Sequence, residues 1–190
     1  SALCSKFFEG DKTSKRFFRD KELLLKDLAA DPRSPRSLFY LAQTCQCLNQ
    51  HDEALYYSKL RLEFKGTELN QFEEERFHSY MRCGNSAFIL GHDWHDVMAW
   101  YIKAFENYLR AEPLIKIADY YRIKAGAELN VKGPEEAFKW WRTSYMFLRE
   151  ACDLNYPEHC ILFVDRGVYD YYRWHLLGIV GYRIGKMEEG

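Results

Sequence analysis

Apolar residues recur three and four positions apart along most of this chain, which is the spacing that lines one face of an α-helix. No segment alternates with period two for long, so strands are not expected. The run ILFV at 161–164 is interpreted as a buried helix start or an extended link. The predicted fold class is therefore all-α. Two clear stripes are Leu23, Leu24 and Leu28, expected to form a short helix after Arg19-Asp20, and then Leu38, Leu41, Ala42, Cys45 and Leu48.

The prolines fall where these helices would begin or end. Proline suits the first turn of a helix but disrupts a helix interior. Their placement therefore predicts long helical segments separated by short links. The positions are Pro32, Pro35, Pro113, Pro134 and Pro157.

Small residues predict that the helices pair as hairpins. Ala54, Val97 and Ala137 each follow a predicted turn, near the point where a second helix would cross the first. A small side chain lets two helix backbones approach closely, whereas a larger one would force them apart. We therefore expect all three side chains to be buried at helix crossings.

The end of the chain carries the most specific hairpin pattern. Residues 174–190 read WHLLGIVGYRIGKMEEG, in which Trp174 is followed by Leu177 and Gly178, and Gly190 stands where a second helix would open. This pattern resembles the first helix and turn of a tetratricopeptide (TPR) unit, although the spacing between hairpins exceeds the usual repeat of about 34 residues. The resemblance implies a right-handed superhelical array of about three and a half TPR-like helical hairpins. Because the pattern stops inside a hairpin, we expect a piece of a longer polypeptide.

A broader resemblance covers residues 11–190, and its most specific parts are RSLFYLAQT, RAEPL and LFVDRGVYDY. Segments like these occur in this order in a group of viral and bacterial proteins, where a TPR-like region follows a sugar-nucleotide-dependent glycosyltransferase domain. The resemblance implies that residues 1–18 are a linker from a preceding, absent domain and that residues 19–190 are a TPR-like α-helical repeat domain.

Catalytic motifs are not found in the sequence. There is no DxD metal motif, no glycine-rich phosphate loop, no GxSxG and no Cys-His arrangement with a defensible spacing. The run Glu73, Glu74 and Glu75 points in successive directions around a helix, so we interpret it as a solvated face. A chain with no catalytic residues and no cofactor is expected.

The segment GHDWHD leaves two interpretations open. His92 and His95 are three residues apart and could hold a divalent ion on one helix face. Alternatively, Asp93 caps the following helix by accepting hydrogen bonds from its first backbone N–H groups. The capping interpretation is favoured because it explains every position of the turn, and no metal site is predicted.

Charge and cysteine content exclude several classes of protein. Lys and Arg number 27 against 28 Asp and Glu, a net charge of -1, which argues against a dedicated nucleic-acid partner. The six cysteines contain no CxxC pair and suggest a reducing compartment. No apolar run approaches the roughly 20 residues of a membrane span. A soluble, cytoplasmic protein without a membrane partner is expected.

Two sets of residues are the candidate sites. First helices of helical-repeat hairpins line a concave face that usually binds a partner. A second set surrounds VYDYY, where an Arg–Asp pair among aromatic residues is expected to hold the link between hairpins. The predicted concave-face residues are Arg36, Phe39, Gln43, Ile115, Asp119 and Arg122, and the predicted inter-hairpin residues are Asp165, Arg166 and Asp170.

The function predicted from the resemblance is a non-catalytic TPR-like accessory module, covalently linked to a glycosyltransferase domain. It would bind a protein or glycan acceptor or mediate self-association, for example as a homodimer. The alternative is an independent cytosolic TPR adaptor that binds a partner peptide in its concave groove. An unrecognised helical enzyme is a third and less favoured hypothesis.

Overall fold

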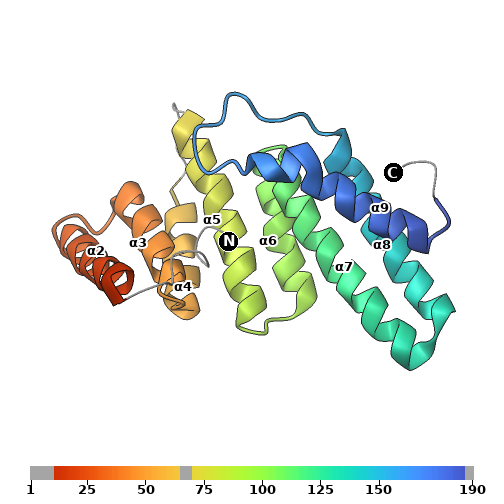
Figure 1. The fold of residues 1–190 in the computed structure, drawn as a ribbon. Coiled ribbons are helices and arrows are strands. Elements are labelled where there is room, and N and C mark those ends of the chain that lie inside the picture. Colours follow the sequence, from red (N-terminus) through yellow and green to blue (C-terminus); the bar gives the residue numbers. More distant parts are fainter. Residues whose placement is uncertain (1–10, 65–69, 187–190) are drawn as a thin grey trace. The chain divides into compact units, whose positions relative to one another are not determined.

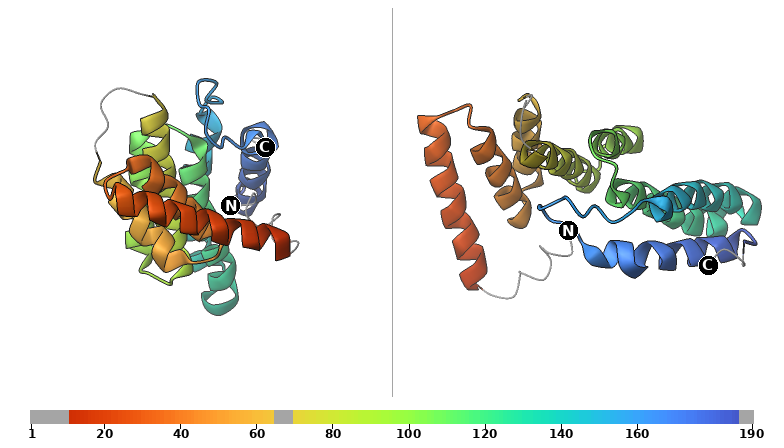
Figure 2. Two further views of the ribbon diagram at one scale, coloured as in Figure 1. Left: turned by 90° about the vertical axis from the view of Figure 1, so that its left-hand side faces the viewer. Right: turned by 90° about the horizontal axis from the view of Figure 1, so that it is seen from above.

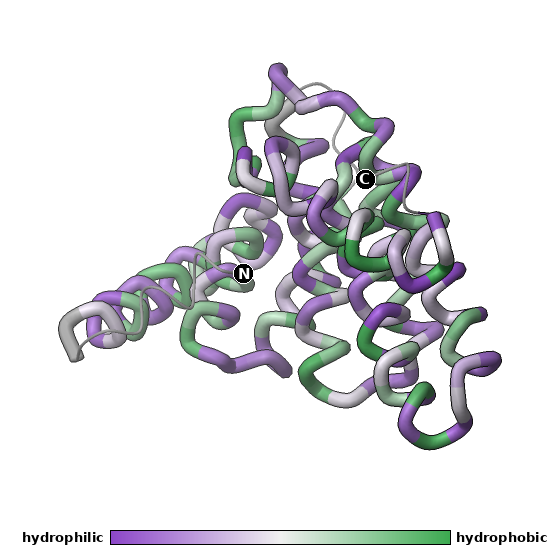
Figure 3. The backbone as a smooth tube through the Cα atoms, turned by 45° about the vertical axis from the view of Figure 1, so that its right-hand side comes forward, coloured by the Kyte–Doolittle hydropathy of each residue, from purple (hydrophilic) through white to green (hydrophobic). Residues whose placement is uncertain are grey.

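The structure is a computed structural model that describes residues 11–64 and 70–186. These residues form α-helices and one π-helical turn, and no strand occurs among them. The predicted all-α class is confirmed. Figure 3 shows apolar and polar residues alternating along the helices, as amphipathic packing requires. Within the described ranges, no helix is both long enough and apolar enough to span a membrane.

The chain divides into two compact units, residues up to Trp100 and residues from Tyr101 onward. Figures 1 and 2 show the helices of each unit, coloured along the sequence. The first unit holds α2, α3, α4 and α5, and the second holds α7, α8, η1 and α9. Helix α6 begins in the first unit and ends in the second. The helices are α2 (Asp11–Ala30), α3 (Pro35–Cys47), α4 (His51–Leu62), α5 (Asn70–Ile89), α6 (Trp94–Asn107), α7 (Ala111–Lys132), α8 (Pro134–Asp153), the π-helix η1 (Val168–Tyr172) and α9 (Arg173–Arg183).

In the first unit, α3 and α4 form a hairpin. Ser34 caps α3 by accepting a hydrogen bond from the Ser37 amide at 3.3 Å, and Pro35 opens the helix. Asn49 makes the turn into α4 with a left-handed φ of 58°. Ala54 is completely buried against Leu41 and Cys45, as predicted for a crossing position.

Helix α2 is longer than the sequence pattern indicated. It begins at Asp11 instead of after Asp20, so residues 11–18 of the predicted linker are helical. The physical reason is that Phe17 extends the inner stripe of Leu24 and Leu28 by two turns at helical spacing. Lys21 on the same face reaches the start of α4 and donates to Gln50 at 2.8 Å. Residues 1–10 of the predicted linker lie outside the described residues.

Helices α4 and α5 are joined by a buried ion pair. The Arg61 guanidinium is completely buried and lies 2.9 Å from Glu75, with its centre 3.9 Å from the centroid of the Phe72 ring. Glu74 is also buried, at 1% exposed. The interpretation of Glu73 to Glu75 as a solvated face is therefore wrong for Glu74 and Glu75. For Glu75 the reason is that Arg61 of α4 contributes a cation to this side of α5.

The second unit is built on the antiparallel pair α7 and α8, with α9 packed along α8 (Figure 1). Gly133 turns the chain with φ 89°, a conformation that favours glycine, and Pro134 begins α8. Ala137 is completely buried and belongs to the same core as Leu148 and Val180. Val97 in the first unit is also completely buried. All three predicted crossing residues are therefore inside the protein.

A segment without helix or strand, residues 154–165, returns the chain from α8 to η1. It contains the ILFV run, so of the two interpretations of that run the link is confirmed and the helix start is not. Phe163 has φ 47°, which is unusual for a bulky side chain.

Candidate functional site

The predicted concave-face residues of the first unit are only partly at the surface. Arg36 is exposed and lies over the ring of Tyr40, 5.5 Å from its centroid. Gln43 is half-buried. Phe39 is completely buried, and the Arg82 guanidinium lies 5.0 Å from its ring centroid. The expectation that Phe39 projects from the surface is wrong, because α5 covers it with Arg82.

The corresponding residues of the second unit lie on α7. Ile115 is 6% exposed and belongs to the core, so its predicted place on a binding surface is also wrong. Asp119 and Arg122, three residues apart, form an ion pair of 2.7 Å, and each side chain is about a third exposed. The Asp119 carboxylate also accepts a hydrogen bond of 2.8 Å from Arg122 Nε. Both guanidinium nitrogens contact the same oxygen, Asp119 Oδ1, and together they hold the guanidinium in a fixed orientation.

Tyr172 of η1 lies close enough to this ion pair for both charges to act on its hydroxyl. Burial, and then the negative charge of Asp119, raise the pKa of Tyr172, whereas Arg122 opposes the shift. Lys116, one turn before Asp119 on α7, has its pKa lowered by desolvation. We call Lys116, Asp119, Arg122 and Tyr172 the α7–η1 strip. Of these four residues, the sequence had indicated Asp119 and Arg122.

Near the start of α7 lies a buried polar cluster that the sequence did not indicate. The Arg110 side chain is 1% exposed and forms an ion pair with Glu112. The Tyr169 hydroxyl donates to Glu112 at 2.9 Å and accepts from the Ala111 amide at 3.1 Å. Arg110 also donates to the backbone carbonyls of Leu162 and Phe163, at 3.4 and 3.2 Å. The cluster fixes the return segment and η1 to the start of α7.

This cluster joins the two most specific motifs of the second unit. RAEPL supplies Arg110 and Glu112, and LFVDRGVYDY supplies the two carbonyls and Tyr169. The sequence signal was present, because both motifs combine charged residues with apolar ones. The pairing could not be predicted because 57 positions separate Glu112 from Tyr169.

The predicted inter-hairpin residues make local contacts. The Asp165 carboxylate accepts a hydrogen bond of 3.0 Å from the Gly167 amide and so begins the helical segment. Arg166 and Asp170 are 3.7 Å apart, but their side chains are 70% and 61% exposed. The pair is therefore solvated, contrary to the expected desolvation, because the buried positions beside it are taken by Tyr169 and Arg173. A role of these three residues between hairpins stays a prediction.

Arg173 is a further buried cation that the sequence did not indicate. Its Nη1 donates to the carbonyls of Ala151 and Leu154, at 2.8 and 2.6 Å. Its Nε donates to the Tyr169 carbonyl at 3.1 Å. Because the carbonyls at a helix C-terminus have no partner within the helix, Arg173 satisfies the end of α8 and ties it to η1.

The GHDWHD segment is a helix cap. Asp93 Oδ1 accepts a hydrogen bond of 2.8 Å from the His95 amide at the start of α6. The capping interpretation is confirmed. Hydrogen bonds from His95 hold the pKa of Asp93 below its ordinary range. Among the residues that the structure describes, no three His, Cys, Asp or Glu side chains are grouped so that they could hold a metal ion.

Five cysteines in the described ranges are free thiols, and four of them are buried. Burial raises the pKa of Cys45 and of Cys152 to about 11. Because the thiolate is the nucleophile and the metal ligand, these two buried thiols are chemically inert at neutral pH. Neither Cys45 nor Cys152 is a candidate catalytic residue.

The hairpins and the crossing residues together define a helical-repeat fold of the TPR type. One solved crystal structure of the protein MamA is similar to this chain, with a TM-score of 0.54 and 13% sequence identity over 99% of this chain and 84% of that chain. A second crystal structure of MamA has a TM-score of 0.49 and 14% identity over 94% of this chain and 84% of that one. No protein-family model and no curated protein sequence matches the chain. At these identities the similarity concerns the fold alone.

Proposed function

We propose that this chain is a non-catalytic protein-interaction module that binds a partner peptide at the α7–η1 strip. Stacked helical hairpins commonly bind partners along their first helices, and α7 is the first helix of the α7–α8 hairpin. The observation that carries the proposal is the Asp119–Arg122 pair, which is partly exposed beside Tyr172. A preoriented guanidinium and an aromatic ring are typical anchors of protein interfaces.

The chemistry of the strip favours a peptide with an acidic residue next to an apolar one. The planar fork of Arg122 matches a carboxylate, and Asp119 already orients it. Lys116 carries a second positive charge whose pKa is lowered by desolvation, so an incoming anion would stabilise its charged form. An apolar side chain of the peptide would pack on the ring of Tyr172.

The test is a selection of peptides from a random display library, followed by affinity measurements. Arg122→Ala is expected to weaken binding of the selected peptides about tenfold, the usual range for an interface anchor. Tyr172→Ala is expected to have a similar effect. Arg19→Ala, at an exposed arginine of α2 that belongs to neither candidate site, is the matched control. Equal affinity of the wild type, Arg122→Ala and Tyr172→Ala would contradict the proposal.

The resemblance of the sequence suggests a finer proposal, that the module serves a glycosyltransferase by binding its protein or glycan acceptor. The TPR-type fold is equally compatible with an independent adaptor. The reading frame of the intact gene distinguishes the two. A nucleotide-sugar-binding domain encoded upstream of Ser1 is the expected result, and a start codon at that position would contradict the accessory role.

A further inference from the structure

The hydroxyl group of Tyr169 joins η1 to the start of α7. It donates a hydrogen bond to the Glu112 carboxylate at 2.9 Å and accepts one from the Ala111 amide at 3.1 Å. Ala111 is the first residue of α7, so its amide has no partner within the helix. Tyr169 is 3% exposed, so both hydrogen bonds lie away from water, where they are stronger than at the surface. We call these two hydrogen bonds the Tyr169 bridge.

The Tyr169 bridge and the α7–η1 strip share the same two elements. On α7, Glu112 and Asp119 are seven residues apart, which places them on one face of the helix, about 10 Å from each other along its axis. On η1, Tyr172 follows Tyr169 by three residues, which is less than one helical turn. A shift of η1 against α7 at the bridge would therefore displace Tyr172 from the Asp119–Arg122 pair.

The second buried anchor of η1 is directed at a different helix. Arg173 donates to the carbonyls of Ala151 and Leu154 at the end of α8, and also to the Tyr169 carbonyl. These contacts hold η1 against α8, whereas the Tyr169 bridge runs to α7. Of the two anchors, the bridge is therefore the one that fixes η1 relative to the helix that carries the strip.

We infer that the Tyr169 hydroxyl is a positioning group for partner binding at the α7–η1 strip. By bonding to Glu112 and Ala111, it holds η1 where Tyr172 lies beside Arg122. This inference rests on the function proposed above. Because coupling between two sites is reciprocal, a peptide bound at the strip also stabilises the Tyr169 bridge.

Tyr169→Phe tests the inference, because it keeps the buried ring and removes both hydrogen bonds. The affinity of a peptide selected on the wild type is expected to fall about tenfold, within the usual range of coupling between sites. Burial and Asp119 raise the pKa of Tyr172 in the wild type, and this pKa is expected to fall toward the ordinary value of about 10. NMR of the tyrosine ring carbons measures the pKa, and circular dichroism checks that the variant is folded. A loss of stability with η1 in place would not change the pKa.

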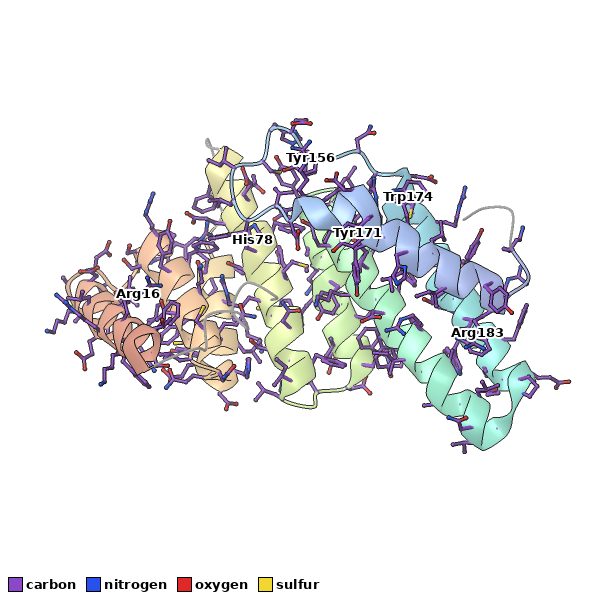
Figure 4. All side chains as sticks on the ribbon, in the orientation of Figure 1. Arg16, His78, Tyr156, Tyr171, Trp174 and Arg183 are labelled. Atoms are coloured by element: carbon purple, nitrogen blue, oxygen red, sulfur yellow. The ribbon has the colours of Figure 1, made fainter. Side chains whose placement is uncertain are left out.

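Tyr156→Phe is the matched control. The Tyr156 ring packs on the Tyr169 ring, with centroids 5.3 Å apart. Figure 4 labels Tyr156 on the return segment and Tyr171 on η1. The substitution removes a hydroxyl next to the bridge and leaves both of its hydrogen bonds in place. It is expected to change neither the peptide affinity nor the pKa of Tyr172.

Hydrogen exchange of the Ala111 amide tests the reciprocal effect in the wild-type chain. A bound peptide is expected to slow this exchange about tenfold, the same factor by which the bridge strengthens peptide binding. The reference is the Ala137 amide, which donates to the Gly133 carbonyl at the start of α8 and should exchange at an unchanged rate. This measurement needs no substitution, so it decides the question even if Tyr169→Phe does not fold.

Two results would overturn the inference and leave the proposed function intact. One is a folded Tyr169→Phe chain that binds the peptide at the strip with wild-type affinity. The other is an Ala111 amide whose exchange the bound peptide leaves unchanged. If no peptide binds at the strip, the proposed function fails. A lowered pKa of Tyr172 in Tyr169→Phe would then still support the placement of Tyr172 by the bridge, and an unchanged pKa would refute it.

Discussion

The second unit depends on a few buried residues whose charges and hydrogen bonds match one another. Arg110, Glu112 and Tyr169 come from two distant motifs and satisfy each other inside the protein. A buried cation is strongly destabilising once its carboxylate is removed, because its desolvation is no longer compensated. The stability of the second unit is therefore more sensitive to Glu112 than to exposed charged residues.

Glu112→Gln is expected to lower the free energy of unfolding by about 3 kcal/mol, because it leaves the Arg110 guanidinium buried without a negative partner. Urea unfolding followed by circular dichroism measures the change. The matched control is Glu128→Gln, which removes an i,i+4 pair with the exposed Lys132 and should cost less than about 1 kcal/mol. Equal effects of the two substitutions would contradict the structural role of the Arg110–Glu112 pair.

The buried cysteines predict a dependence of stability on alkaline pH. Burial raises the pKa of Cys45 and Cys152 to about 11 in the folded chain, above the value of about 8.5 for an exposed thiol. Their contribution to stability is therefore complete below the unfolded pKa and is lost as pH rises through the folded pKa. The free energy of unfolding of the wild type should fall between about pH 8.5 and 11. The free energy of unfolding of the double variant Cys45→Ser/Cys152→Ser should fall less steeply over the same range.

Maleimide labelling followed by mass spectrometry measures how fast the same thiols react at neutral pH and so tests whether they are buried. Cys160 is half-buried and should react before Cys45 and Cys152. Fast labelling of Cys45 in the folded chain would be inconsistent with its burial.

Among the helices, α6 shows how one side chain sets a boundary. The Asp93 carboxylate accepts a hydrogen bond from the His95 amide, and this hydrogen bond lowers the pKa of Asp93. The stabilisation by the cap is therefore present at neutral pH and is lost as pH falls through the lowered pKa. Asp93→Ala is expected to lower Tm by a few degrees, whereas His92→Ala at the neighbouring exposed position should change Tm little. A rise in Tm on addition of Zn²⁺ would instead favour the metal interpretation of GHDWHD.

Helix class, helix pairing and the ends marked by proline or a capping residue could be predicted from local signals, whereas the start of α2 and the buried ion pairs could not. Prolines and small residues act within one or two turns, so they indicated α8 after Gly133 and the burial of Ala54, Val97 and Ala137. The start of α2 was missed because basic residues obscure the stripe that begins at Phe17.

Of the candidate site, Asp119 and Arg122 were found from their spacing on one helix face. Phe39 and Ile115 share that periodicity but belong to the core, since spacing alone does not distinguish an inner face from a partly exposed one. Tyr172 was missed because its proximity to the pair depends on the return segment and on η1. Lys116 lies one turn before Asp119 on α7, so its proximity to the pair is local in sequence.

For the whole molecule, the division into two units predicts that a core defect acts mainly within its own unit. Leu148 is completely buried in the core of the second unit. Leu148→Ala is expected to destabilise that unit by about 2–5 kcal/mol. In stacked hairpins each repeat contacts its neighbours, so hydrogen exchange should accelerate strongly in α7 and α8 and weakly in α3 and α4. Equal acceleration in both hairpins, measured by mass spectrometry, would show one cooperative unit.

Binding of a partner peptide at the α7–η1 strip is tested most directly by an NMR titration. A peptide selected for binding is added to the isotope-labelled chain, and the shifts of the backbone amides are mapped. We expect the largest shifts at residues 116–122 of α7 and at 168–172 of η1, and we expect them to disappear in Arg122→Ala. Shifts confined to other helices, or unchanged in Arg122→Ala, would contradict binding at this strip.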